Sequence, residues 1–108
     1  MKQHTTPDQT AKLIELGFAE PKTKLLFEVA NDELGYTYSI GELIEILPPS
    51  YSDRWKGDCY LIIRHDSVFW FVGYIVSGAR KPHIRLSNIE LVDTLYDMIV
   101  KLKEEEII

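Results

Sequence analysis

The sequence of 108 residues contains little that would identify a reaction or a compartment outside the cytoplasm. Its single cysteine, Cys59, excludes an intramolecular disulfide and a structural zinc site built from cysteine pairs. The longest strongly apolar run covers nine residues, 68–76, whereas a membrane-spanning helix needs about 20. The first residues lack the apolar segment of a secretory signal. We therefore expect a soluble, cytoplasmic protein with no membrane partner and with a buried, free Cys59.

Recognisable catalytic and cofactor motifs are also absent. The sequence has no glycine-rich phosphate loop, no metal-binding histidine pair and no nucleophile elbow. The histidines are scattered, and the adjacent His65 and Asp66 are typical of a solvated turn. We therefore expect no catalytic residues, no metal, no cofactor and no small-molecule ligand. An enzyme with an unrecognised site is the least favoured alternative.

What the sequence does contain is the composition of a globular chain, with 45% hydrophobic and 27% charged residues. Its length fits one domain over 1–108. Three segments carry a capping hydroxyl followed three residues later by Gln or Glu, the pattern of a helix start. These pairs are Thr6 with Gln9, Ser39 with Glu42 and Ser87 with Glu90. They predict helices over about 7–16, 40–47 and 88–105.

Apolar spacing predicts which side of each helix is buried. The first helix is expected to bury Ala11, Leu13, Ile14 and Phe18. The second is expected to bury Ile40, Leu43, Ile44 and Leu47. The third carries a long stripe made of Leu91, Val92, Leu95, Met98, Ile99 and Leu102.

The strongest strand signals are 58–64 and 68–76, which three turn residues join into a predicted hairpin. Weaker signals predict strands over 24–30 and 36–38. Because adjacent antiparallel strands alternate with separate helices, we expect an α+β domain. Its small antiparallel sheet of three to four strands would pack against the three helices.

The strand over 68–76 is apolar on both faces, which does not fit a sheet with one face in water. One face carries Val68, Trp70, Val72, Tyr74 and Val76, and the other carries Phe69, Phe71, Gly73 and Ile75. Either helices cover both faces or one face meets another subunit, and we favour a homodimer. A loop over 48–57 adds a second aromatic anchor. The candidate interface residues are Trp55, Trp70, Tyr74 and Tyr51.

The net charge of −5 opposes broad nucleic-acid binding but hides an asymmetry. Residues 54–86 carry six cationic and two acidic side chains, whereas both flanking regions are acidic. Acidic helices could fold over the basic strands and cancel their charge, or the cations could form an anion-binding or nucleic-acid patch. The candidate patch is Arg54, Lys56, Arg64, Arg80, Lys81 and Arg85.

Three stretches carry a resemblance. They are TPDQTAKLIELGF at 6–18, YSIGELIEILP at 38–48 and ELVDTLYDMIVKLKEE at 90–105. Together they resemble a group of small uncharacterised proteins of gut anaerobic bacteria, Bacteroides-like, often associated with prophages or conjugative elements. The resemblance covers all three helices and implies a bacterial accessory protein of a phage or mobile element.

These observations together favour a non-enzymatic protein whose partner is another protein or a second copy of itself. The alternative is a nucleic-acid-associated regulator that uses the basic segment over 54–85.

Overall fold

The computed structural model describes residues 3–21 and 37–108. Its helices are α1 (Pro7–Glu15), α2 (Ile40–Ile46) and α3 (Leu91–Glu104). Its strands are β1 (Ser50–Asp53), β2 (Gly57–Asp66), β3 (Phe69–Val76) and β4 (Ile84–Asn88). The predicted α+β class, with three helices and one antiparallel sheet, is confirmed. The predicted strand over 24–30 lies outside the described residues.

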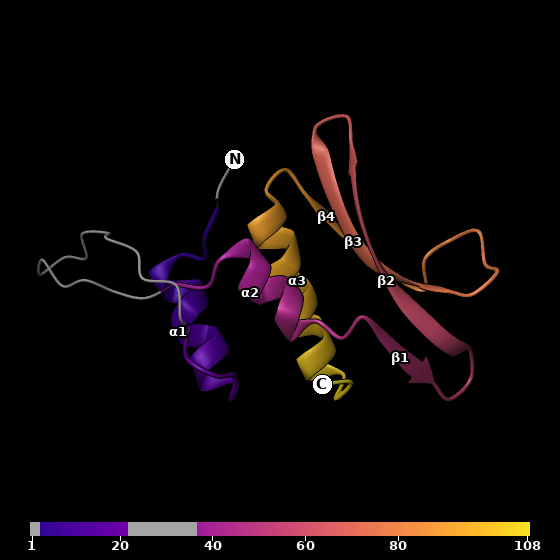
Figure 1. Cartoon of the computed structure of the whole chain (residues 1–108), viewed down its shortest axis with the longest axis horizontal. Coiled ribbons are helices and arrows are strands. Elements are labelled where there is room, and N and C mark those ends of the chain that lie inside the picture. Colours follow the sequence, from indigo (N-terminus) through magenta and orange to yellow (C-terminus); the bar gives the residue numbers. More distant parts are fainter. Residues whose placement is uncertain (1–2, 22–36) are drawn as a thin grey trace, which may run out of the picture.

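The four strands follow one another in the sheet in the order β1-β2-β3-β4, and each pairs antiparallel with the next. The predicted hairpin is the β2–β3 pair, in which Ile62 lies opposite Gly73 and Arg64 lies opposite Phe71. His65 and Asp66, which were expected in its turn, instead belong to β2 and pair with β3. Figure 1 shows the helices in layers on one side of this sheet. Helix α3 packs on β3 and β4, α2 packs on α3, and α1 lies outermost.

Two of the predicted capping boxes are confirmed. The Thr6 hydroxyl accepts the Gln9 amide at 3.1 Å, and the Gln9 side chain accepts the Thr6 amide at 2.9 Å. Ser39 and Glu42 make the same reciprocal pair at the start of α2. These bonds satisfy amides that the first turn of a helix leaves without partners. They fix where both helices begin.

The third predicted capping box is wrong. Ser87 belongs to β4, where it pairs with Phe71, and α3 begins only at Leu91. The Asn88 side chain instead accepts the Glu90 amide at 3.2 Å, which turns the chain from strand into helix. Pairing with β3 therefore prevails over the local helix signal at Ser87.

Two strands were not predicted. The segment expected to be a loop over 48–57 contains β1, and the basic segment over 77–85 ends in β4. The predicted strand over 36–38 is not formed by its described part, because Thr37 and Tyr38 lie outside any strand. The Thr5 amide donates instead to the Tyr38 carbonyl at 3.0 Å, and His4 and Ser39 form an isolated bridge.

The core lies where α3 meets the sheet. All six residues of the predicted α3 stripe are buried, and so is the free Cys59. Of the predicted α1 face, Leu13 is buried and Phe18 is half-buried, but Ala11 and Ile14 are exposed. Ile44 of α2 is also exposed. In both outer helices the buried face is therefore narrower than the apolar spacing predicts.

None of the helices in the described ranges is long and apolar enough to cross a membrane.

Candidate functional site

The two faces of β3 have different environments. Its inner face, defined by Val72 and Tyr74, points toward α3, and both side chains are fully buried. Its outer face carries Phe69, Phe71, Gly73 and Ile75, and no helix of the described residues packs on that face. The outer face continues on β2 through Tyr60, Ile62, Arg64 and Asp66 and on β4 through Arg85 and Ser87. The apolar character predicted for both faces is present, but the described helices cover only the inner one.

The outer face is hollowed near its centre, with a volume of about 190 Å³. This basic hollow is lined by Ile62, Arg64, Asp66, Phe71, Gly73, Arg80, Lys81, Pro82 and Arg85. Gly73 provides part of the wall without a side chain. A Cβ atom there would collide with the Ile84 carbonyl oxygen of β4. The glycine thus permits β4 to approach β3 closely.

Four cations line this hollow together with Phe71. Arg64 lies directly opposite Phe71 on β2, and the guanidinium carbon of Arg85 lies 4.1 Å from the ring centroid. Arg80 and Lys81 come from the connection between β3 and β4. That connection returns to the sheet where the His83 amide donates to the Tyr74 carbonyl at 2.8 Å. Four members of the predicted basic patch therefore line one hollow, in which Arg64 from β2 joins three cations of the segment 80–85.

The remaining two members of the predicted patch lie elsewhere. Arg54 and Lys56 belong to the turn between β1 and β2 and do not line the basic hollow. Arg54 instead lies beside Trp55, with its guanidinium carbon 5.4 Å from the ring centroid.

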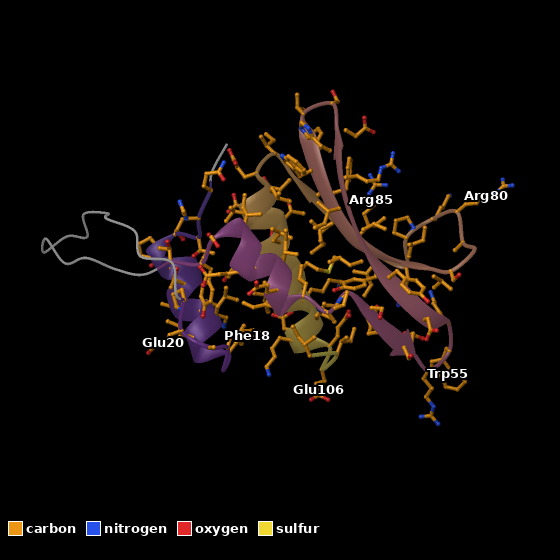
Figure 2. All side chains as sticks on the ribbon, in the orientation of Figure 1. Phe18, Glu20, Trp55, Arg80, Arg85 and Glu106 are labelled. Carbon is orange, nitrogen blue, oxygen red and sulfur yellow. The ribbon has the colours of Figure 1, made fainter. Side chains whose placement is uncertain are left out.

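The acidic helices do not neutralise the basic hollow. Within residues 3–21 and 37–108, none of its four cations forms an ion pair with a carboxylate. Figure 2 shows Arg80 and Arg85 on the side of the sheet away from the helices, with Glu20 beyond α1 on the opposite side. A second hollow near α1 and α2 is lined by Glu20, Glu42 and Glu45. Charge is therefore separated across the domain.

Asp66 is the single acidic residue among the described residues that line the basic hollow. Its side chain is exposed and makes no hydrogen bond or ion pair with the described part of the chain. Its neighbour His65 points to the other face of the sheet, where its ring stacks on Trp70 at 4.4 Å. The two residues thus serve different surfaces.

The four predicted interface residues do not form one surface. Trp55 is 85% exposed at the tip of the β1–β2 turn. Tyr74 is fully buried, and its hydroxyl donates to the Pro48 carbonyl at 2.7 Å, so it belongs to the core. Tyr51 packs edge-on against Tyr74, and Trp70 is half-buried beside His65.

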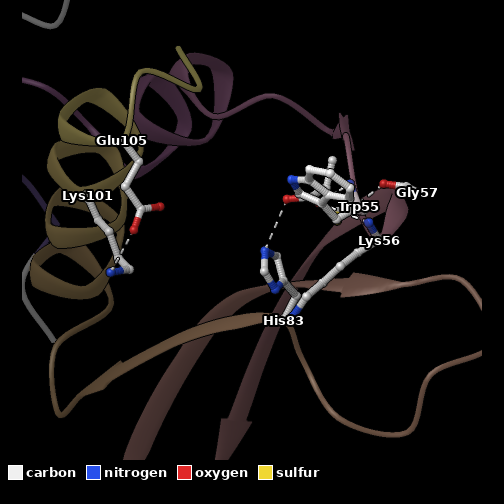
Figure 3. Close-up of polar contacts among 8 residues, drawn as sticks. Trp55, Lys56, Gly57, His83, Lys101 and Glu105 are labelled. Atoms are coloured by element: carbon white, nitrogen blue, oxygen red, sulfur yellow. Dashed lines mark hydrogen bonds and ion pairs between the residues drawn. The ribbon is translucent and has the colours of Figure 1, made fainter.

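The Asp53 carboxylate holds the turn that carries Trp55 in place. One oxygen of the Asp53 carboxylate accepts the amides of Trp55 at 2.8 Å and Lys56 at 3.0 Å. The other lies 3.5 Å from His83 Nε2, a contact drawn in Figure 3. The hydrogen bond from the Trp55 amide, with that of Lys56 and the nearby His83, holds the pKa of Asp53 below its usual value. The Asp53–His83 pair therefore ties this turn to the chain that enters β4.

No group of three or more potential metal ligands gathers in the part of the chain that the structure describes. Sequence reasoning named the cations of the hollow but missed Phe71 and Asp66 as site residues. The signal that could have found them is the hairpin register, which puts Phe71 opposite Arg64 and places Asp66 two pairs further on, on the same face.

Comparison with known proteins finds no matching family model, no matching curated protein and no matching solved structure. The resemblance to proteins of gut bacteria and the association with mobile elements stay predictions.

Proposed function

We propose that this protein is a non-catalytic binding protein that holds single-stranded nucleic acid on the outer face of its sheet. The observation that carries the proposal is that four cationic side chains line one hollow with Phe71, and that Arg85 lies over the Phe71 ring. No helix among the described residues covers this face. Guanidinium groups bind phosphate through paired hydrogen bonds, and aromatic rings stack on unpaired bases. The basic hollow offers both kinds of group within one site.

The shape of the site favours a single strand over a duplex. The Phe71 ring and the Arg85 guanidinium lie within a hollow in the sheet, and Tyr60 on the same face is 46% exposed. Bases that are paired inside a duplex cannot stack on such groups, whereas bases of a single strand can be splayed onto them. A patch of positive charge without aromatic rings would not distinguish single-stranded from double-stranded nucleic acid.

The charge of the outer face also bears on the predicted homodimer. Four cations and one carboxylate line the basic hollow, so two copies packed face to face would bring like charges together. This pattern favours an anionic partner on this face over a second copy. Self-association stays a prediction, and sedimentation of the free protein at micromolar concentration tests it.

Binding of a fluorescent oligothymidine of about ten nucleotides, a length typical of one binding module, tests the proposal. Fluorescence anisotropy should show saturable binding that weakens as salt is added. If all four cations contact phosphates, the logarithm of the association constant should fall with a slope of about −3 against the logarithm of salt concentration. A duplex of the same length should bind at least about tenfold more weakly because its bases cannot stack.

A matched pair of double variants localises the site. Arg80→Glu with Lys81→Glu reverses two charges in the basic hollow, and Arg54→Glu with Lys56→Glu makes the same charge change at the β1–β2 turn. All four side chains are exposed, so both variants should fold. The hollow variant should lose at least about tenfold in affinity, and the turn variant less than about threefold. Equal losses, or no binding by the unmodified protein at low salt, would overturn the proposal.

A further inference from the structure

We infer that Arg64 and Asp66 together select guanine at one position of the bound strand. This inference rests on the proposed function, because it assigns a base preference to the same site. The two residues alternate on the outer face of β2, with Arg64 opposite Phe71 and Asp66 opposite Phe69. Both line the basic hollow.

The spacing of the two side chains suits a purine. Residues two apart on a strand lie about 6.7 Å apart along its direction and point to the same face. Asp66 is also a diagonal neighbour of Phe71 across the β2–β3 pair, a separation that long side chains and a bound ring can bridge. A base stacked on Phe71, or on the Arg85 guanidinium above it, would therefore have its edges near both charged groups.

The chemistry of the pair selects one base. The Arg64 guanidinium can donate two hydrogen bonds to O6 and N7 of guanine, a pairing that no other base accepts equally well. The Asp66 carboxylate can accept two hydrogen bonds from the N1 imino group and the N2 amino group of guanine. On the Watson–Crick edge, adenine, cytosine and thymine each have a hydrogen-bond acceptor beside their donor. This acceptor would face the Asp66 carboxylate and be repelled by it. Arg64 thus supplies donors for one edge of guanine, and Asp66 supplies acceptors for the other edge.

The position of Asp66 gives a second reason for a role in recognition. A carboxylate at a phosphate-binding surface lowers the affinity for the backbone, because like charges repel. Asp66 is nevertheless placed beside four cations without an ion pair to any of them in the described ranges. Its oxygens are therefore available to a ligand group that donates hydrogen bonds, and guanine is the base that offers two such donors side by side.

The base preference is measured by comparing the affinities of four strands. Three are oligothymidines with one central guanine, adenine or cytosine, and the fourth is the all-thymidine strand. We expect the guanine strand to bind about tenfold more tightly than the other three, because a bidentate base contact contributes roughly that much discrimination. Asp66→Asn should reduce the guanine preference to less than about twofold, while binding of the all-thymidine strand is retained or strengthened by the loss of a negative charge.

Two further variants make the test specific. Asp58→Asn removes the same charge from an exposed residue on the same face of β2 outside the hollow, and it should leave the guanine preference intact. Arg64→Lys keeps the positive charge but loses the paired donors, so it should weaken the guanine preference more than oligothymidine binding.

The possible failures are distinguishable. If the protein binds oligothymidine but shows no guanine preference, or if Asp66→Asn keeps that preference, the inference is overturned and the proposed function stands. If no single strand binds, both are overturned.

Discussion

The inner and outer faces of β3 are equally apolar in sequence but differ in what surrounds them. On the inner face, Val72 and Tyr74 are fully buried against α3 and the neighbouring strands. On the outer face, Phe71 and Ile75 are half-buried, and cations from β2, β4 and the β3–β4 connection line the same hollow as Phe71. Apolar residues on a strand thus indicate a buried face only when the residues of the neighbouring strands are apolar too. Where the neighbours are charged, the same apolar residues can form a platform for a ligand.

We infer from this difference that the inner face stabilises the fold, and we propose that the outer face binds the ligand. Burial of apolar area on the inner face contributes to the free energy of unfolding, since truncation there leaves a cavity. Truncation on the outer face removes contacts that are already partly exposed to water, so the loss of stability is smaller.

The largest expected effect comes from truncating the inner face. Tyr74→Ala should lower the free energy of unfolding by about 3–5 kcal/mol, because it opens a cavity beneath Tyr51 and removes the hydrogen bond to Pro48. Phe71→Ala, the matched truncation on the outer face, should cost less than about 1.5 kcal/mol and should weaken oligonucleotide binding by about tenfold. Urea denaturation and anisotropy measure the two quantities. Equal costs in stability would contradict the division between the faces.

A smaller effect is expected from adding a side chain at Gly73. Gly73→Ala adds a Cβ that collides with the backbone of β4, so β4 must shift away from β3. We expect a loss of about 1–3 kcal/mol in the free energy of unfolding, which is typical of overpacking. Because Arg85 moves with β4, affinity for a single strand should also fall. A variant with unchanged denaturation midpoint and affinity would show that the close approach of β4 does not shape the hollow.

The smallest effect concerns the β1–β2 turn, away from the outer face. The pKa of Asp53 is lower in the folded protein than its unfolded value near 3.9, so its ionised form stabilises the fold above about pH 4. This contribution is lost as the pH falls through the lowered pKa. Asp53→Ala should therefore lower the melting temperature at pH 6, and the difference from the unmodified protein should shrink toward pH 2. A constant difference over this range would contradict the role of the carboxylate.

The fold could be predicted from sequence where one pattern is long and repeated. The α3 stripe and the β2–β3 hairpin are of this kind. Strand β1 carries only one apolar residue, Tyr51, and so lacks a strand pattern. Strand β4 does alternate, with Ile84 and Leu86 on one face, but the adjacent Ser87 imitates a helix cap.

The candidate site could be predicted only as a set of residue types. The cations were identifiable from local charge, and four of the six line the basic hollow. Their convergence depends on how the connection after β3 folds back and on the register that sets Arg64 opposite Phe71. Both are tertiary features, which no short stretch of sequence specifies. For the same reason, Asp66 was identified only as part of a turn.

The most direct test of the central claim is a titration of the isotopically labelled protein with oligothymidine, followed by amide chemical shifts. We predict that the shifts concentrate on the outer face around Arg64, Phe71 and Arg85 and on the connection that carries Arg80. We expect little change on α2 or at the β1–β2 turn. Shifts confined to α2 or to the turn around Trp55, with the basic hollow unperturbed, would contradict this claim.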